Sequence, residues 1–258
     1  MKIFFTGGSG FVGREIIPLL KKNGHKVIAP SSKDLNLLDS DAVDNFVQEQ
    51  KFDAIIHSAI YGGRRCKKDD LNDYYNNIRM FENIFKYVKD VDRFINFDSG
   101  ASLFKNNIIP DTPYGFSKYT IARSVDDAIN GTNLRIYGCF GITEQSNRFF
   151  AVNINNYIDK KPITIIKDKL MDFMYIDDIH MIVELALKEE IKDCDCVYST
   201  KYRLTDLAEM INNLDTHDVP IIMEDRKMGS NYCGSYKNFD IDFIGIEEGI
   251  KRCYESFC

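Results

Sequence analysis

The chain has 258 residues and a formal net charge of −6, and 44% of its residues are apolar while 28% are charged. This composition is typical of a globular protein with a full hydrophobic core, and it excludes a mini-protein and a disordered chain. The acidic balance argues against a nucleic-acid binder, which needs a basic face. The longest basic run, residues 64–68, is short and is predicted to be a solvated loop.

The sequence also gives no support for a membrane span or a metal site. No stretch approaches the roughly 18 apolar residues of a membrane span, and the N-terminal apolar run gives way at once to glycines. We therefore expect a cytoplasmic protein without membrane contact. The seven cysteines show no C-x-x-C pair and no histidine at zinc spacing, which predicts reduced thiols and no metal site.

In the first half of the chain, short apolar runs alternate with segments of helical periodicity. The runs predict parallel strands at residues 2–5, 25–29, 52–58, 93–97 and 133–137. The periodic segments predict helices at 11–22, 40–50, 70–89 and 114–129. Ser40, followed by acidic residues, is expected to cap the second helix.

After residue 141 the pattern loosens. It predicts helices at 147–158, 176–188, 205–212 and 243–257, with Thr205 as a cap, and strands at 163–166 and 196–199. The alternation predicts an α/β fold, a Rossmann-type doubly wound parallel sheet with a small discontinuous C-terminal lobe. We expect an NADP-binding domain at 1–141 plus 175–200 and a substrate-binding lobe at 142–174 plus 201–258.

A glycine-rich loop joins the first strand to the first helix, with the spacing G-x-x-G-x-x-G at Gly7, Gly10 and Gly13. Gly7 would permit the tight turn, Gly10 would let the backbone approach a pyrophosphate, and Gly13 would let the helix pack closely on the sheet. The helix N-terminus would offer free N–H groups to the phosphates. The position after a strand and before a helix therefore predicts dinucleotide binding.

The end of the second strand bears on the choice between NAD and NADP. No carboxylate follows it until Asp34, and the nearby side chains are those of Ser31, Ser32, Lys33 and Arg14. These side chains could satisfy a 2′-phosphate, which favours NADP while leaving NAD possible. Asp39 is placed either to meet the adenine amino group or to cap the next helix.

Tyr114 and Lys118 lie four residues apart and share one face of a predicted helix. A nearby ammonium lowers the pKa of a phenol, so Tyr114 could exchange a proton with a carbinol or carbonyl oxygen while a nicotinamide carries hydride. A third member is expected at the end of the fourth strand. Ser99 could orient the substrate oxygen, and Ser102 is the competing candidate.

Together these motifs resemble the extended short-chain dehydrogenase/reductase superfamily, in its NAD-dependent epimerase/dehydratase family. The matching segments run in order along the chain at residues 6–13, 34–39, 57–59, the helix of Asn77, Tyr114 with Lys118, 134–141 and 171–179. The resemblance implies catalytic roles for Ser99, Tyr114 and Lys118. It also implies a homodimer formed through the helices at 70–89 and 114–129.

The resemblance further implies two sets of contacts. The cofactor contacts would be Gly7, Gly8, Ser9, Gly10, Phe11, Val12, Gly13, Ser31, Ser32, Lys33, Leu38, Asp39, Ser58, Ala59, Ile60, Asn77, Tyr114 and Lys118. The substrate contacts would be Tyr61, Gly62, Ser102, Asn147, Arg148 and Phe149.

Within the family, residues 34–39, 57–63 and 145–150 resemble GDP-L-fucose synthase-like nucleotide-sugar 4-keto reductases. Ala101 stands where those enzymes carry an acid/base cysteine, and Arg148 or a neighbour stands where they carry a histidine. Gly100 and Ala101 also replace the Asp-Glu pair of sugar-nucleotide dehydratases. Met171 replaces the arginine usual in its segment, and Arg148 could take over its diphosphate contact.

The sequence therefore predicts an NADP-dependent reductase of a nucleoside-diphosphate 4-keto-(deoxy)sugar, with hydride delivered to C4 and Tyr114 as proton donor. One alternative is an NAD-dependent nucleotide-sugar C4 epimerase, which would use the same three residues in both directions. A second alternative is a non-catalytic Rossmann protein that senses NADP, although sensing does not require the Tyr114 and Lys118 pair.

Overall fold

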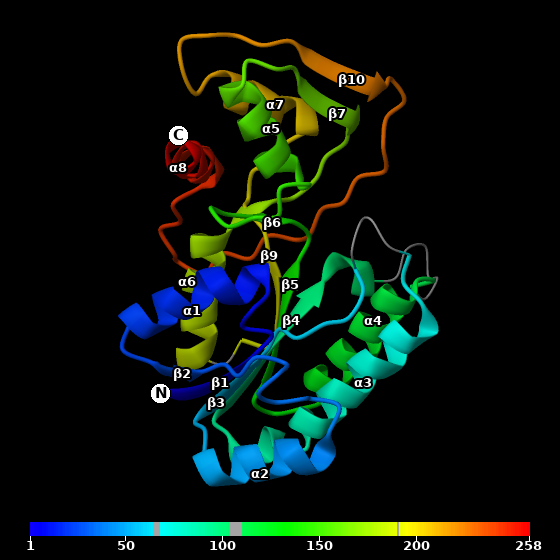
Figure 1. Cartoon of the computed structure of the whole chain (residues 1–258), viewed down its shortest axis with the longest axis vertical. Helices are drawn as coiled ribbons and strands as arrows, with labels where there is room; N and C mark the ends of the chain where they lie inside the picture. The colour runs from blue at the N-terminus through cyan, green and yellow to red at the C-terminus, as the bar shows by residue number, and fades with distance from the viewer. Residues whose placement is uncertain (64–67, 104–109, 190) are drawn as a thin grey trace. The chain divides into compact units, whose positions relative to one another are not determined.

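The computed structural model describes residues 1–63, 68–103, 110–189 and 191–258. Most of the basic run predicted as a solvated loop, with Cys66 inside it, lies outside the described residues. The chain divides into two compact units (Figure 1). Unit 1 comprises Met1–Ile136 and Ile182–Cys194, and unit 2 comprises Tyr137–Met181 and Asp195–Cys258. The assignment of cofactor and substrate domains to 1–141 plus 175–200 and to the remainder stays a prediction.

A six-stranded sheet forms the centre of unit 1. Its strands are β1 (Lys2–Thr6), β2 (Lys26–Ile28), β3 (Ala54–His57), β4 (Arg93–Ser99), β5 (Gly131–Ile136) and β9 (Asp193–Cys196). They lie in the order β2-β1-β3-β4-β5-β9, and the pairings of β1 with β2 and β3, of β3 with β4 and of β4 with β5 are parallel. The predicted Rossmann-type α/β fold is therefore confirmed.

Helices cover both faces of this sheet (Figure 1). They are α1 (Phe11–Lys22), α2 (Ser40–Gln50), α3 (Leu71–Phe85), α4 (Pro113–Asp126) and the C-terminal part of α6 (Ile176–Lys188), with short 3₁₀ turns η1 (Val88–Asp90) and η2 (Gly100–Ser102). The helices α3 and α4 pack side by side on one face. On the other, the end of α1 is tied to α6 by Glu184, which accepts from Asn23 Nδ2 at 3.0 Å and lies 3.2 Å from His25 Nε2.

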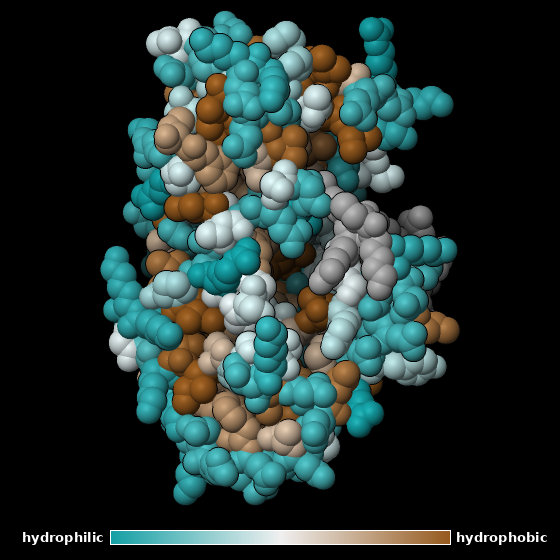
Figure 2. Space-filling model, viewed as in Figure 1, coloured by the Kyte–Doolittle hydropathy of each residue, from teal (hydrophilic) through white to brown (hydrophobic). Residues whose placement is uncertain are grey.

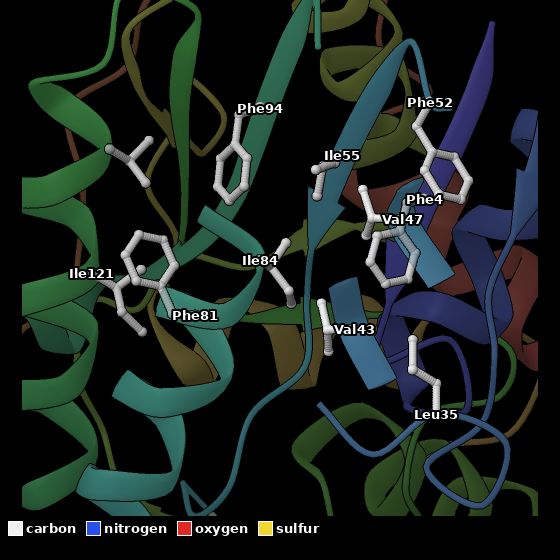
Figure 3. Close-up of a cluster of buried hydrophobic side chains, with 11 residues drawn as sticks. Phe4, Leu35, Val43, Val47, Phe52, Ile55, Phe81, Ile84, Phe94 and Ile121 are labelled. Carbon is white, nitrogen blue, oxygen red and sulfur yellow. The ribbon is translucent and has the colours of Figure 1, made fainter. Parts of the chain in front are cut away.

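A hydrophobic core cluster of unit 1 lies between the sheet and the helices α2, α3 and α4 (Figure 3). It contains Phe4, Leu35, Val43, Val47, Phe52, Ile55, Phe81, Ile84, Phe94, Ile121 and Val125, all of them buried. The helical spacing of Val43 and Val47, and of Ile121 and Val125, places each pair on the face that meets the sheet. The outer face of α2, at the lower end of the view in Figure 2, is hydrophilic.

Unit 2 is built from the helices α5 (Phe149–Ile158), α7 (Leu204–Asn212) and α8 (Ile246–Phe257) and two small sheets. One sheet pairs β7 (Ile163–Lys167) with β10 (Ile221–Asp225), and the other pairs β6 (Cys139–Phe140) with β8 (Met174–Tyr175), both in parallel. The sequence analysis did not predict β6, β8 or β10. Phe140 stacks on Phe150 at 4.1 Å between ring centroids, so aromatic side chains form part of this core.

Two predicted caps were wrong, each because a carboxylate nearby competes for the role. Asp39, not Ser40, caps α2, since its Oδ1 accepts from the Ala42 N–H at 3.1 Å. The helix α7 begins one residue before Thr205, and the Thr205 N–H donates to Asp168 Oδ1 at 3.2 Å instead.

The strand predicted at 196–199 lies at Asp193–Cys196, three residues earlier. Arg135 of β5 donates to the Asp193 carboxylate at 2.7 Å, which ties the start of β9 to its neighbour. In the part of the chain that the structure describes, no helix combines the length and apolarity needed to cross a bilayer.

Candidate active site

The glycine loop leaves β1 at the point where the strand order of the sheet reverses, between β1 and β3. Gly7 has φ of +72°, a conformation that favours glycine, and the Gly10 N–H donates to its carbonyl at 3.0 Å. A Cβ on Gly7 would lie 2.7 Å from the Ala59 nitrogen, so the loop backbone rests directly on the chain that leaves β3. Ligands of parallel α/β sheets bind in this crevice at the carboxyl ends of the strands.

The structure shows a contact of Gly13 that the sequence analysis did not consider. A Cβ on Gly13 would lie 2.6 Å from Gly8 Cα and 2.8 Å from the Gly7 carbonyl, so the first turn of α1 packs directly on the loop. Gly10 is less confined, since its Cβ would meet only the Gly7 carbonyl, at 3.2 Å. The loop therefore folds compactly on itself, with Gly13 packed against Gly8.

The N-terminus of α1 suits an anion. Its N-cap is Gly10, which has no side chain to accept from the first-turn amides, and the first turn holds no acidic residue. The 12-residue helix therefore presents open N–H groups and the positive end of its dipole beside the loop. These features fit the pyrophosphate of a dinucleotide.

Thr6, the last residue of β1, ties the ends of β1 and β3 together. Its hydroxyl oxygen accepts from the N–H groups of Ser58 and Ala59, at 3.1 and 3.2 Å, and lies 3.0 Å from His57 Nδ1. With both lone pairs engaged, the hydroxyl donates its proton to His57 Nδ1. Burial, reinforced by the positive charge of Lys118, lowers the pKa of His57 to about 3, so this ring is neutral and structural.

The segment that follows β3 is held by Asn77 of α3. Asn77 is buried, accepts from the Tyr61 N–H at 2.7 Å, and donates to the Tyr61 carbonyl at 3.0 Å and to Ser117 Oγ at 3.1 Å. The sequence analysis placed Asn77 among the cofactor contacts. In the structure its amide positions the backbone of Tyr61, a predicted substrate contact, against α4.

This segment then reaches the predicted catalytic tyrosine. Gly62 and Gly63 both have positive φ, of +77° and +67°, and a Cβ on Gly63 would lie 2.8 Å from Tyr114 Cε2. The tyrosine stands in the first turn of α4, where Thr112 Oγ1 accepts from the Gly115 N–H at 3.0 Å as the N-cap. Close contacts thus run from Gly7 through the segment after β3 to Tyr114.

Lys118 follows one turn later on α4 and is almost fully buried. Its Nζ donates to the Phe97 carbonyl of β4 at 2.5 Å, which leaves two further ammonium protons to donate. Burial lowers the pKa of Lys118 to about 8, while the carboxylate of Asp98 opposes that shift. A lysine in this state sits near the working range of proton-transfer chemistry.

The two candidate serines differ in their surroundings. Ser102 donates its hydroxyl to Asp98 Oδ2 at 2.8 Å and is 4% exposed, so its proton is held inside the protein. Ser99 is the last residue of β4 and accepts from the Ala101 N–H at 3.2 Å. Of the two, Ser99 stands at the carboxyl end of the strand, level with the other strand ends.

The predicted adenosine contacts lie on the loops after β2. Ser31 is half-buried, while Ser32 and Lys33 are exposed. Ser31 donates its hydroxyl to Asp34 Oδ2 at 2.6 Å, so a carboxylate is bound within the loop expected to take a 2′-phosphate. Asp39 acts as the cap of α2, the second of the two roles considered for it.

The remaining predicted substrate contacts belong to unit 2. Arg148 is the N-cap residue of α5, and its Nε lies 3.6 Å from Glu144 Oε1. Asn147 is exposed and Phe149 is half-buried. Met171, which stands in place of the family arginine, is buried. The positive charge of Arg148 is thus partly balanced by the carboxylate of Glu144 within the same unit.

Four residues of the site escaped the sequence analysis: Thr6, Gly63, Asp98 and Arg135. The sequence carried no clear signal for the last pair, because their strands hold other polar residues as well, such as Asn96 and Asn133. Asp98 and Arg135 are cross-strand neighbours in β4 and β5, joined by a bond of 2.9 Å from Arg135 Nε to Asp98 Oδ2.

A parallel sheet with a glycine loop at its switch point and a tyrosine–lysine pair on a neighbouring helix defines a Rossmann-type dinucleotide-binding protein. The model of the NAD dependent epimerase/dehydratase family matches residues 3–195, more than half of the chain. The chain belongs to this family, as the sequence motifs predicted. NAD or NADP is the cofactor typical of the family, and the fit of the glycine loop agrees with it.

Curated relatives are distant. A GDP-L-fucose synthase of Azorhizobium caulinodans is 32% identical over 104 residues, which are 39% of this chain and 33% of that protein. The match thus spans about a third of that relative. A CDP-abequose synthase of Yersinia pseudotuberculosis is 28% identical over 203 residues, 69% of this chain and 70% of that protein.

Solved structures share the fold across the whole chain. A UDP-glucose 4-epimerase of Thermotoga maritima, crystallised with UDP-glucose, matches with a TM-score of 0.81 at 18% identity and covers 100% of this chain and 98% of its own. A GDP-L-fucose synthetase of Naegleria fowleri bound to NADP matches with a TM-score of 0.82 at 17% identity, over 99% and 92% of the two chains.

Proposed function

We propose that the chain is an NADP-dependent reductase of a nucleoside-diphosphate 4-keto-(deoxy)sugar. The observation that carries the proposal is the run of close contacts from Gly7 to Ala59 and from Gly63 to Tyr114. It brings an anion-binding loop, a half-buried tyrosine and a buried lysine to one edge of one sheet. Such an edge is where a dinucleotide and a reacting carbonyl meet in parallel α/β proteins.

The glycine loop and the start of α1 would hold the pyrophosphate of the cofactor, for which the open amides of α1 are suited. When bound, the dinucleotide supplies the hydride for the carbonyl carbon. Ser31, Ser32 and Lys33 would contact the adenosine 2′-phosphate. Ser58, Ala59 and Ile60 would line the path between the two ends of the cofactor.

Tyr114 would donate a proton to the oxygen at C4 as the carbonyl is reduced, and Ser99 would orient that oxygen. Lys118 would hold a positive charge beside the phenol, which favours its ionised form. Because burial brings the pKa of Lys118 to about 8, this charge is present at neutral pH and is lost at more alkaline pH. Proton donation at such a site contributes about 10²–10⁴-fold to rate.

The substrate class rests on the relatives, whose names concern GDP-L-fucose and CDP-abequose synthesis. Tyr61 and Gly62 in unit 1, and Asn147, Arg148 and Phe149 in unit 2, are the proposed substrate contacts. Ala101 offers no acid or base two residues after Ser99. This favours a simple reduction over a reaction that also inverts neighbouring carbons.

An NAD-dependent C4 epimerase is the second candidate, and one observation favours it. The Asp34 carboxylate, bonded to Ser31, places negative charge in the loop proposed for the 2′-phosphate. A carboxylate there disfavours NADP and suits the free 2′-hydroxyl of NAD.

The deciding experiment follows NADPH absorbance in the presence of nucleoside-diphosphate 4-keto-sugars. We expect net oxidation of NADPH with at least one of them, and a loss of turnover of about 10²–10⁴-fold in Tyr114→Phe with cofactor binding retained. Tyr119→Phe, on the same helix, is the matched control and should keep full activity. Interconversion of two nucleotide sugars without net NADPH consumption would overturn the reductase in favour of the epimerase.

The same variant addresses the non-catalytic alternative. A sensor of NADP needs the glycine loop but not a proton donor. Retention of the wild-type phenotype by Tyr114→Phe, with no turnover in either protein, would support the sensor and contradict both enzyme proposals.

A further inference from the structure

A ladder of polar side chains lies beneath α4, on the face of the sheet that this helix covers. Asn96 of β4 donates to Asn133 of β5 at 2.8 Å, and Asn133 in turn donates to the Ala122 carbonyl and to Asp126 of α4, at 2.9 and 2.8 Å. Two residues along each strand, on the same face, stand Asp98 and Arg135. The helix α4, which carries Tyr114 and Lys118, therefore packs on polar cross-strand pairs.

Asp98 is the member of this ladder nearest the candidate site. Its side chain is fully buried, and its Oδ2 accepts both from Arg135 Nε at 2.9 Å and from Ser102 Oγ at 2.8 Å. Its Oδ1 is buried and has no hydrogen bond within the described residues. Burial raises the pKa of Asp98, while Arg135 and Lys118 oppose the rise. A buried carboxylate acts on neighbouring charges more strongly than a surface one, because solvent screens it less.

The ionisable groups around Asp98 and Lys118 come from three elements. Arg135 of β5 is shared, because its Nη2 also donates to Asp193 of β9, whose side chain is 45% exposed. Lys118 of α4 donates to the carbonyl of Phe97, the residue before Asp98. His57 of β3 is neutral because burial lowers its pKa to about 3. Because Arg135 is shared between two carboxylates, it does not act on Asp98 alone, and Lys118 is the second cation whose charge favours the ionised form of Asp98.

We propose that Asp98 is a positioning residue of the candidate site, which keeps the Lys118 ammonium charged and anchors the turn after Ser99 through the Ser102 hydroxyl. The inference deepens the proposed function and rests on it. Asp98 touches neither substrate nor cofactor and acts through Lys118 and Ser102. The competing explanation is that Asp98 only balances the charge of Arg135 and stabilises the sheet.

Two variants separate these explanations. Asp98→Asn removes the charge while keeping the shape and leaves Arg135 without one of its two carboxylates, which is costly for a largely buried cation. The double variant Asp98→Asn with Arg135→Gln removes both charges and relieves that cost. Asp193→Asn is the matched control, since it removes the other carboxylate of Arg135 without touching Lys118 or Ser102.

The first readout requires no turnover. In protein labelled with ¹³C-lysine, NMR follows the titration of Lys118 in the wild type and in the three variants. We expect its midpoint to fall by about one pH unit in Asp98→Asn and to stay lowered in the double variant. In Asp193→Asn we expect the wild-type midpoint.

The second readout is the pH profile of NADPH oxidation. The alkaline limb of kcat should move to lower pH in Asp98→Asn and in the double variant, with the KM for NADPH within about twofold of the wild type. An unshifted Lys118 midpoint in Asp98→Asn, or a midpoint restored in the double variant, would overturn the proposal in favour of simple charge balance. If Asp98→Asn does not fold, the double variant decides alone.

The two proposals fail in different ways. A wild-type protein that oxidises no NADPH with keto-sugar nucleotides contradicts the proposed function, while the Lys118 titration still decides the role of Asp98. A protein with the expected turnover but an unshifted titration contradicts only the role of Asp98.

Discussion

The side-chain amide of Asn77 forms hydrogen bonds with both the N–H and the carbonyl of Tyr61. Its Oδ1 accepts from the Tyr61 N–H at 2.7 Å, and its Nδ2 donates to the Tyr61 carbonyl at 3.0 Å. One buried amide on α3 thereby substitutes for the strand partner that the chain loses when it leaves β3. The path of the segment from β3 to Tyr114 depends on this arrangement.

Replacement of Asn77 by alanine tests that dependence. The variant leaves the amide and carbonyl of Tyr61 without partners, and we expect a loss of about 1–3 kcal/mol in the free energy of unfolding. Cofactor affinity should fall with it, because the segment no longer holds its course toward Tyr114. Urea denaturation and NADPH titration measure both quantities. Asn76→Ala, at the preceding position of α3, is the control, and equal losses in the two variants would contradict the role assigned to Asn77.

The glycines of the loop should differ in what they tolerate. A methyl group at Gly13 meets the backbone of Gly8 at 2.6 Å and cannot be relieved by a side-chain shift, so we expect Gly13→Ala to cost about 1–3 kcal/mol of folding stability. A methyl group at Gly10 meets only the Gly7 carbonyl, at 3.2 Å. Gly10→Ala should therefore lose cofactor affinity with a smaller change in thermal stability, and the reverse order would contradict this account of the loop.

Cofactor preference should respond to the carboxylate after β2. Asp34→Asn removes the negative charge bonded to Ser31, and we expect NADPH to bind on the order of threefold more tightly relative to NADH than in the wild type. The gain should shrink at high salt because the loop is exposed. Fluorescence titration with the two cofactors gives the ratio. Glu49→Gln, an exposed carboxylate on α2, is the control and should leave the ratio at its wild-type value.

The buried histidine predicts acid sensitivity of unit 1. The pKa of His57 is about 3 in the folded protein against 6.5 when unfolded. Its contribution to stability is therefore complete above pH 6.5 and is lost as the pH falls toward 3, because the unfolded chain binds the extra proton. Between pH 6.5 and 4 this loss amounts to roughly 3 kcal/mol.

His57→Gln removes the titration and keeps an acceptor for Thr6. We expect this variant to be less stable than the wild type at pH 7 but to lose less stability on acidification. Urea unfolding at pH 7, 5 and 4 gives the two slopes, and parallel slopes would contradict the assignment.

We predict that the homodimer implied by the family resemblance forms through an exposed apolar surface on α3 and α4. Leu71 is 66% exposed, Tyr75 is 63% exposed, and Phe116 stacks on Tyr74 at 5.2 Å between centroids. Contiguous exposed aromatic surface of this kind is typical of an interface. We expect light scattering to give the mass of a dimer for the wild type and of a monomer for Leu71→Glu with Tyr75→Glu. Ile129→Glu, at an apolar position that is 84% exposed and follows α4, should leave the mass unchanged.

Much of unit 1 was predictable from local pattern. The first helix and α2 begin and end where periodicity predicts, because each shows a clear apolar face and a stop signal such as Asn23 with Gly24. Long helical patterns predicted helices that extend too far. The helix predicted at 70–89 is α3, which ends at Phe85. The periodicity continues there, but the chain turns through η1 to reach β4.

The site was predictable only where a motif carries its own chemistry. Gly7, Tyr114 and Lys118 could be identified from the spacing of their motifs. Asp98 and Arg135 could not be identified in this way, because their pairing depends on cross-strand register, which no local pattern contains. The strand β9 was misplaced for the same reason, since its polar sequence lacks an apolar run and its position depends on Arg135.

The contact between Gly13 and Gly8 has a consequence for cofactor choice. Because the loop is shaped by its own backbone, it needs no ligand to acquire its form, and little ordering entropy is lost when a pyrophosphate arrives. Under the proposed function, the scaffold itself holds the half that NAD and NADP share, and the separate loop at residues 31–34 selects between them. Affinity and selectivity become independently adjustable, so substitutions that exchange one cofactor for the other need not disturb the fold that holds either.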